Sequence, residues 1–222
     1  MNENNQRTPW YRQAAAVIPK YWYLKSTGTM LFISVFFGAY FYFLKHPAYP
    51  ITVMHNTLLD RLIGFQPLAL PVYLSLWVYV SLPPLFFATR RGLYEYGLDI
   101  ALMCIAGLAV FYFWPTAVPA ADIDWALYPG VTFLKNMDAS GNAFPSLHVA
   151  TAVFSGVWLH HLLRRFGGPF WILMLNAVWG IGIIYSTIAT RQHVAIDVYA
   201  GFMLGGVAAY LSLRHRIRNG SW

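Results

Sequence analysis

Two short polar segments carry most of the residues in this sequence that could perform chemistry. The first, FPSLH (residues 144–148), contains Ser146 and His148, and the second, RQHVAID (residues 191–197), contains His193 and Asp197. Residues four apart share one face of a helix, so Asp197 is placed to accept a hydrogen bond from Nδ1 of His193. That bond would fix the imidazole tautomer and leave Nε2 available as a nucleophile or a metal ligand.

The elements that must position these residues follow from the composition. Of the 222 residues, 58% are hydrophobic and only 10% are charged, which is too little polar material to cover a soluble globule. Several stretches approach the roughly 20 apolar residues that a membrane-spanning helix needs. We therefore predict an all-α, polytopic membrane protein that forms a single domain over residues 1–222. Its six transmembrane helices are predicted over 28–44, 67–88, 98–114, 143–163, 169–190 and 194–213.

Basic residues set the predicted orientation of these helices. Lys and Arg next to a span are retained on the cytoplasmic side, and here they precede the first helix, occupy alternate loops and follow the last helix. They are Arg7, Arg12, Lys20, Lys25, Arg90, Arg91, Arg164, Arg165, Arg214, Arg216 and Arg218. Both termini are therefore predicted to be cytoplasmic. The net charge of +7 is interpreted as an orientation signal, and no nucleic-acid partner is expected.

With this topology, the two polar segments reach the same membrane depth. Both lie at the outer ends of helices, so His148, His193 and Asp197 converge although they are far apart in sequence. Taken alone, Pro145 and Ser146 fit the start and N-cap of a helix, and the histidines fit the membrane interface. A carboxylate inside an apolar helix is costly and usually has a partner, so the combination indicates a functional site.

The same residues resemble the motifs of a known family. FPSLH resembles the PSxH motif, and RQHVAID resembles the HxxxD part of the last motif, of the type 2 phosphatidic acid phosphatase superfamily. That superfamily includes lipid phosphate phosphatases, vanadium haloperoxidases and, more distantly, inositol phosphorylceramide and sphingomyelin synthases. The motif form with Leu147 after the serine and Phe144 before the proline looks closest to the inositol phosphorylceramide synthase (inositolphosphotransferase) branch. The resemblance covers residues 114–206.

The resemblance implies a role for each motif residue. His193 would attack phosphorus and form a phosphohistidine, Asp197 would hold its ring, and His148 would protonate the leaving alkoxide. The start of the helix at Ser146 would bind phosphate through backbone N–H groups and the serine hydroxyl. This scheme requires no metal and no cofactor. It predicts that His148 and His193 face one cavity, with a gap for a phosphate between them.

The chain departs from the family pattern in its cations. Phosphatase members carry a KxxxxxxRP motif and an Arg six residues before the last His, whereas this chain has no such motif and has Thr187 at that position. Lys135 and Arg191 are the outer-face cations predicted to bind the phosphate instead. A monoester dianion needs more charge-assisted hydrogen bonds than a diester monoanion, so the shortage favours head-group transfer between lipids over hydrolysis.

One alternative remains open from the sequence. A His/His/Asp cluster also suits a transporter or a metal-binding membrane protein, although few polar residues line a route through the predicted spans. The expected partners are a lipid phosphate substrate and the bilayer, and the sequence leaves the oligomeric state open. The predicted localisation is a multi-pass protein of a bacterial inner membrane, with its site facing the periplasm.

Overall fold

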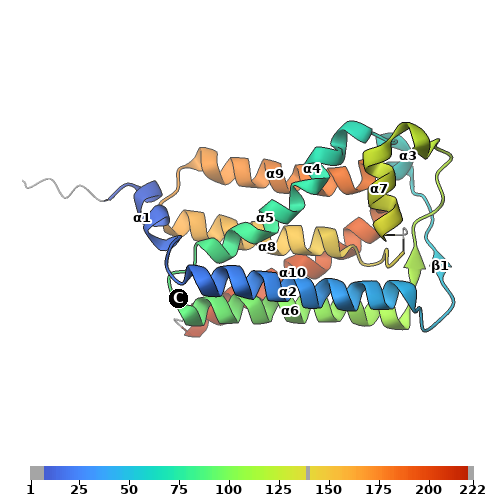
Figure 1. Ribbon diagram of the computed structural model, residues 1–222. Helices are drawn as coiled ribbons and strands as arrows, with labels where there is room; N and C mark the ends of the chain where they lie inside the picture. Colours follow the sequence, from blue (N-terminus) through green and yellow to red (C-terminus); the bar gives the residue numbers. More distant parts are fainter. Residues whose placement is uncertain (1–7, 139–140, 220–222) are drawn as a thin grey trace, which may run out of the picture.

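The protein is a bundle of long helices that run side by side. The computed structural model describes residues 8–138 and 141–219. Short elements gather at one end of the bundle, whereas α1 and the C-terminal end of α10 lie at the other (Figure 1). The helices are α1 (Trp10–Val17), α2 (Trp22–Lys45), α3 (Leu58–Ile63), α4 (Leu70–Leu74), α5 (Leu76–Leu85), α6 (Arg90–Phe113), α7 (Pro129–Asp138), α8 (Leu147–Arg165), α9 (Phe170–Ala189) and α10 (Ala195–Asn219). The 3₁₀ turns are η1 (Pro67–Ala69) and η2 (Trp125–Leu127), and the parallel strands are β1 (Thr52–Val53) and β2 (Thr116–Ala117).

The helical, multi-span character predicted from the sequence is confirmed. Five segments among the described residues are long and apolar enough to cross a membrane: 22–45, 67–85, 90–113, 170–189 and 195–216. They overlap five of the six predicted spans. The remaining predicted span, 143–163, corresponds to α8, which is not among the five. A total of six spans and the cytoplasmic location of the termini therefore stay predictions.

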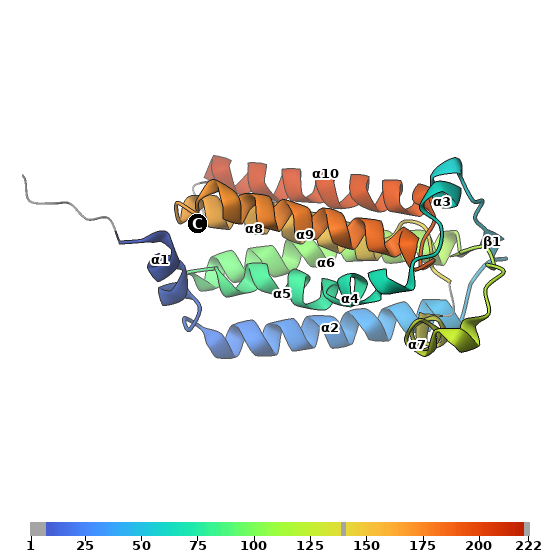
Figure 2. The same ribbon diagram turned by 90° about the horizontal axis from the view of Figure 1, so that it is seen from above.

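Helix α8 occupies the interior of the bundle. It packs against α5, α9 and α10, and Figure 2 shows it among these helices, away from α2 at the edge. Its Val149, Phe154 and Trp158 side chains are fully buried. Because neighbouring helices shield α8, its polar side chains need not face hydrocarbon, which accounts for its lower hydropathy.

Two glycines allow α10 to approach the start of α8 closely. A Cβ added at Gly201 would overlap the Ser146 carbonyl oxygen, and one added at Gly205 would overlap the Ala150 carbonyl oxygen. Small residues permit this backbone contact between membrane helices. The contact fixes the start of α8 against the start of α10, which is where the two polar motifs lie.

The predicted helix 67–88 is interrupted in the structure. A 3₁₀ turn and α4 precede a break at Ser75, and α5 then runs to Leu85. The Ser75 hydroxyl donates to the Val72 carbonyl at 2.6 Å and accepts from Trp179 Nε1 at 2.8 Å. Such a side-chain bond competes with the helical ladder and bends the chain. The sequence analysis missed this break because only the tertiary contact with Trp179 reveals it.

A buried carboxylate joins α3 to α10. Asp60 is 0% exposed and completes a capping box at the start of α3, where Oδ2 accepts from the N–H and the hydroxyl of Thr57 at 2.6 and 2.7 Å. Its other oxygen accepts from the Ala195 N–H at 2.8 Å. Asp60 therefore fixes α3 to the first turn of α10.

We expect Asp60→Ala to lower the free energy of unfolding by about 2–3 kcal/mol, because buried N–H donors would lose a charged acceptor. Thermal or denaturant unfolding of the purified protein in detergent measures this change. Asp122→Ala is the matched control, since Asp122 is an exposed acid at the same end of the bundle. An equal change in both variants would show that the carboxylate at position 60 does not join the two elements.

Candidate active site

The two motif histidines form a hydrogen-bonded pair. His148 lies in the first turn of α8 and His193 lies just before α10, and Nδ1 of His148 is 3.0 Å from Nε2 of His193. The His193 side chain is almost fully buried, and its backbone N–H donates to the Thr187 carbonyl at 3.1 Å. The structure thus brings together two residues that are 45 positions apart.

Asp197 lies behind His193, as predicted, but at ion-pair distance instead of hydrogen-bond distance. Its Oδ2 is 3.7 Å from Nδ1 of His193 and accepts from the Val194 N–H at 3.1 Å. The carboxylate is fully buried, and neither its Oδ1 nor Nδ1 of His193 has a hydrogen-bond partner. A small movement of the His193 ring would bring Nδ1 within hydrogen-bond distance of the carboxylate.

Ser146 caps α8. Its hydroxyl accepts from the Val149 N–H at 3.2 Å, and its backbone N–H donates to the Asp197 carbonyl at 3.0 Å. The second bond joins the two motifs directly. Ser146 is fully buried and lines neither of the two cavities described below. Its predicted contact with phosphate stays a prediction.

Tyr73 is a site residue that the sequence analysis missed. Its hydroxyl lies 3.0 Å from Nε2 of His148, so both ring nitrogens of His148 have a partner. Tyr73 is fully buried in α4, next to the break at Ser75. The signal available in the sequence was a tyrosine two residues after Pro71, near the predicted outer end of a span. That signal does not separate Tyr73 from the many interfacial aromatic residues.

A smaller pocket, which we call the polar pocket after the charged and polar residues in its otherwise apolar lining, lies on the His193 side of the pair. It has a volume of about 280 Å³, and its lining includes His193, Arg61, Arg191, Asn56 and Asp122. Nε of Arg191 is buried without a hydrogen-bond partner. Two arginines therefore line the same pocket as the predicted nucleophile. Arg191 was predicted to bind phosphate, whereas Arg61 was missed because it comes from the distant α3.

Lys135, the other predicted phosphate ligand, lies elsewhere. It is on α7, and its Nζ is 4.5 Å from the centre of the Trp125 ring. Lys135 lines neither the polar pocket nor the apolar cavity. The structure therefore places Arg191 beside His193 but not Lys135.

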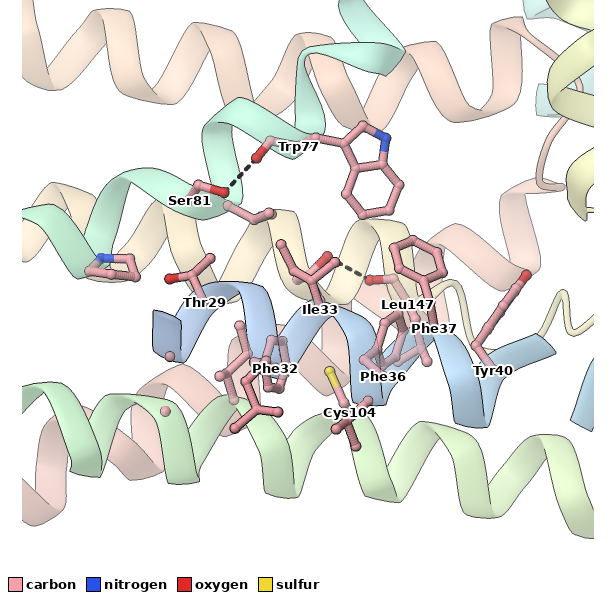
Figure 3. A pocket seen from close by; sticks show the side chains of 18 of the residues that line it. Thr29, Phe32, Ile33, Phe36, Phe37, Tyr40, Trp77, Ser81, Cys104 and Leu147 are labelled. Atoms are coloured by element: carbon pink, nitrogen blue, oxygen red, sulfur yellow. Dashed lines mark hydrogen bonds between the residues drawn. The ribbon is translucent and has the colours of Figure 1, made fainter. Parts of the chain in front are cut away.

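An apolar cavity lies on the His148 side of the pair. Its volume is about 940 Å³, and side chains of α2, α4, α5, α6 and α8 line it. Figure 3 shows aromatic residues of α2, such as Phe36 and Phe37, facing Trp77 and Leu147. His148 and Tyr73 also line this cavity.

The predicted gap between the histidines is absent. Their ring nitrogens are in hydrogen-bond contact, and His148 lines the apolar cavity whereas His193 lines the polar pocket. The prediction of one shared cavity was wrong for this structure. Nδ1 of His148 and Nε2 of His193 instead satisfy each other, as buried polar atoms generally must.

A histidine pair, an adjacent carboxylate and a pocket lined by two arginines form one candidate site, in a chain whose apolar helices fit a multi-pass membrane protein. The chain belongs to the PAP2 superfamily, because the family model of that description matches residues 93–220, more than half of the chain. This superfamily generally comprises phosphatases and phosphotransferases. No curated protein and no solved structure matches the chain.

The matched region contains the histidine pair, Asp197, Ser146 and Arg191. Tyr73 and Arg61 lie before it in the sequence. The family match therefore covers the motif residues of the candidate site but not Tyr73 and Arg61, which only the fold brings to it.

Proposed function

We propose that this protein is an integral-membrane enzyme that transfers the phosphoryl group of a lipid phosphate through a phosphohistidine. The observation that carries the proposal is the contact between Nδ1 of His148 and Nε2 of His193, with a pocket lined by two arginines on one side and an apolar cavity on the other. An amphiphilic phosphate ester has the matching distribution of charge and hydrocarbon.

The reaction begins when substrate phosphate separates the two rings. Nε2 of His193 attacks phosphorus and forms the N–P bond while the bond to the lipid oxygen breaks. His148, held as an imidazolium by the bound phosphate anion, gives its Nδ1 proton to that oxygen, and its Nε2–H stays hydrogen-bonded to the Tyr73 hydroxyl. Asp197 stabilises the positive charge that develops on the His193 ring.

The second step returns His193 to its starting state. Neutral His148 accepts a proton from water or from a lipid hydroxyl, whose oxygen attacks the phosphohistidine. The N–P bond breaks, and free phosphate or a new phosphate ester leaves. Arg61 and Arg191 bind the equatorial phosphate oxygens in both steps.

Hydrolysis of a monoester is our first candidate reaction, and head-group transfer is the second. The sequence pointed to transfer because it lacked the family's arginines. Arg61 and Arg191 beside His193 supply two cations for a dianion, which supports hydrolysis. The form of the FPSLH motif still favours transfer of an inositol phosphate group. A transporter or metal-binding role has no specific observation in its favour.

The test is an activity assay in detergent with two phosphorus substrates. One is phosphatidic acid, and the other is phosphatidylinositol with ceramide or diacylglycerol as the acceptor. Release of free phosphate from phosphatidic acid, dependent on His193, would establish a phosphatase. Transfer of the head group without free phosphate would establish a phosphotransferase. The absence of both reactions under conditions where the protein remains folded would contradict the proposal.

Arg61→Gln and Arg191→Gln are each expected to raise KM for phosphatidic acid about tenfold, because each removes a charged hydrogen-bond donor to phosphate. Lys135→Gln is the matched control and should change KM less than about twofold, since Lys135 lines neither cavity. Steady-state kinetics of the three variants measure the difference. A larger effect of Lys135→Gln than of the two arginine variants would reverse this assignment.

We propose that the polar pocket opens on the periplasmic side of a bacterial inner membrane. The support is the position of the candidate site, which lies at the end of the bundle opposite α1 and the C-terminal end of α10 (Figure 1). Basic residues concentrate near those ends of the chain and in the loops that lie with them, as cytoplasmic segments do. Labelling of single cysteines in α3 and α1 by a membrane-impermeant reagent on intact cells tests this orientation.

A further inference from the structure

The apolar cavity extends from the candidate site far along the bundle. Leu147, next to His148, lines it, and a Cβ added at Gly107 of α6 would overlap the Leu147 side chain. Gly107 is therefore level with the start of α8. Gly97 also lines the cavity and precedes Gly107 by ten residues on the same helix, which corresponds to about 15 Å. The cavity thus reaches from His148 into the other half of the bundle.

The first membrane-spanning helix leaves room for this cavity. Only 6% of the membrane-spanning window of α2 is buried within the protein, the lowest value among the five candidate spans. Figure 2 shows α2 at one edge of the bundle. Residues of α2 from Leu24 to Phe41 line the cavity together with residues of α5 and α6. An elongated apolar ligand in the cavity would cover side chains of α2 that remain exposed in the protein alone.

The proposed reaction determines which side of the histidine pair each part of the substrate occupies. In-line displacement places the leaving oxygen opposite the attacking Nε2 of His193. His148, the proposed acid for that oxygen, is the member of the pair that lines the apolar cavity. The remaining phosphate oxygens then point to Arg61 and Arg191 in the polar pocket.

We propose that this cavity binds the hydrocarbon chain of the lipid whose oxygen leaves phosphorus, and that its far end makes the enzyme selective for long chains. The inference rests on the proposed function and adds to it the location and length dependence of lipid binding. At about 940 Å³, the cavity is near the upper end of the roughly 300–1,000 Å³ range of ligand pockets. Two of its polar residues, His148 and Tyr73, lie at the end where the phosphate ester would be. By contrast, Lys25, near Gly28, donates to the backbone carbonyls of Val17 and Leu85.

Two glycines at the far end allow the cavity to be shortened. A Cβ added at Gly97 of α6 or at Gly28 of α2 meets no atom within 4 Å, and both residues line the cavity. A leucine at either position therefore occupies cavity space without overlapping the protein. Leucine also favours a helix more than glycine does, so the fold should be retained.

The experiment compares dipalmitoyl with dibutyryl phosphatidic acid in mixed micelles, or the matching phosphatidylinositols if the wild type transfers the head group. In Gly97→Leu and Gly28→Leu, the ratio of kcat/KM for the long-chain over the short-chain substrate should fall about tenfold. A dibutyryl lipid does not reach either position, so its turnover reports the chemistry separately.

Matched controls use the same substitution outside the cavity. Gly206→Leu on α10 and Gly38→Leu on α2 also add a side chain where a Cβ meets nothing within 4 Å, and neither residue lines the cavity. Their ratios should stay within about twofold of the wild type. An unchanged ratio in both cavity variants, or an equal fall in the controls, would overturn the inference.

The failure of the inference can be distinguished from the failure of the proposed function. If the wild type turns over neither lipid, the proposed function fails, and equilibrium binding of dipalmitoyl phosphatidic acid takes the place of kinetics. Binding weakened about tenfold by Gly97→Leu but not by Gly206→Leu would still locate the chain in the cavity. Binding that both variants leave unchanged would exclude that location.

Discussion

Replacement of His193 by glutamine is expected to reduce turnover by about 10⁴-fold or more, because loss of a nucleophile removes the covalent route entirely. Glutamine keeps a polar group near Nδ1 of His148 and preserves the backbone bond to Thr187, so the fold should be retained. Release of phosphate from phosphatidic acid measures the rate. Transfer of radioactive phosphate from labelled substrate to the protein, followed by acid and base treatment, detects the phosphohistidine.

Thermal unfolding in detergent is the control for His193→Gln. A variant that unfolds at the wild-type temperature and yet forms no labelled protein supports the nucleophile assignment. Activity close to that of the wild type would contradict the proposed mechanism, because no other described histidine is hydrogen-bonded to His148.

Replacement of His148 by glutamine should have the second largest effect, a fall in kcat of about 10²–10⁴-fold for an alkyl ester such as phosphatidic acid. An alkoxide is a poor leaving group and needs a proton as it departs. The p-nitrophenolate of p-nitrophenyl phosphate leaves without a proton, so kcat for that substrate should fall much less. The difference between the two substrates is the measurement.

Tyr73→Phe serves as the comparison for His148→Gln. It removes the partner of Nε2 but leaves the imidazole, so its effect on phosphatidic acid should be smaller than that of His148→Gln. Equal losses on both substrates in His148→Gln would assign His148 to phosphate binding instead of proton donation.

The motif residues that meet in the candidate site could be located in the sequence because each lies within a few residues of its motif partners. Ser146, His148, His193 and Asp197 are specified by local spacing, and the helices that carry them are specified by apolar length. Both kinds of signal lie in short segments of the chain. Of the two arginines that line the pocket of His193, only Arg191 could be predicted, because it lies two residues before His193 in the sequence.

The remaining site residues depend on contacts between distant segments. Arg61 lines the pocket of His193 because Asp60 bonds the N–H of Ala195, 135 residues away. Tyr73 contacts His148 across 75 residues. Neither pairing leaves a pattern in the sequence. The absence of a phosphate-sized gap could not be predicted either, because it depends on how two buried rings satisfy their polar atoms when no substrate is present.

The contact between His148 and His193 separates a pocket lined by charged groups from a cavity lined by hydrocarbon. On cleavage of an amphiphile at this contact, each product would be released into the solvent that dissolves it. Inorganic phosphate would diffuse into water past the arginines, and the lipid alcohol would return to the bilayer beside α2. We therefore expect inorganic phosphate to inhibit the enzyme in competition with the substrate head group, because both would bind in the polar pocket.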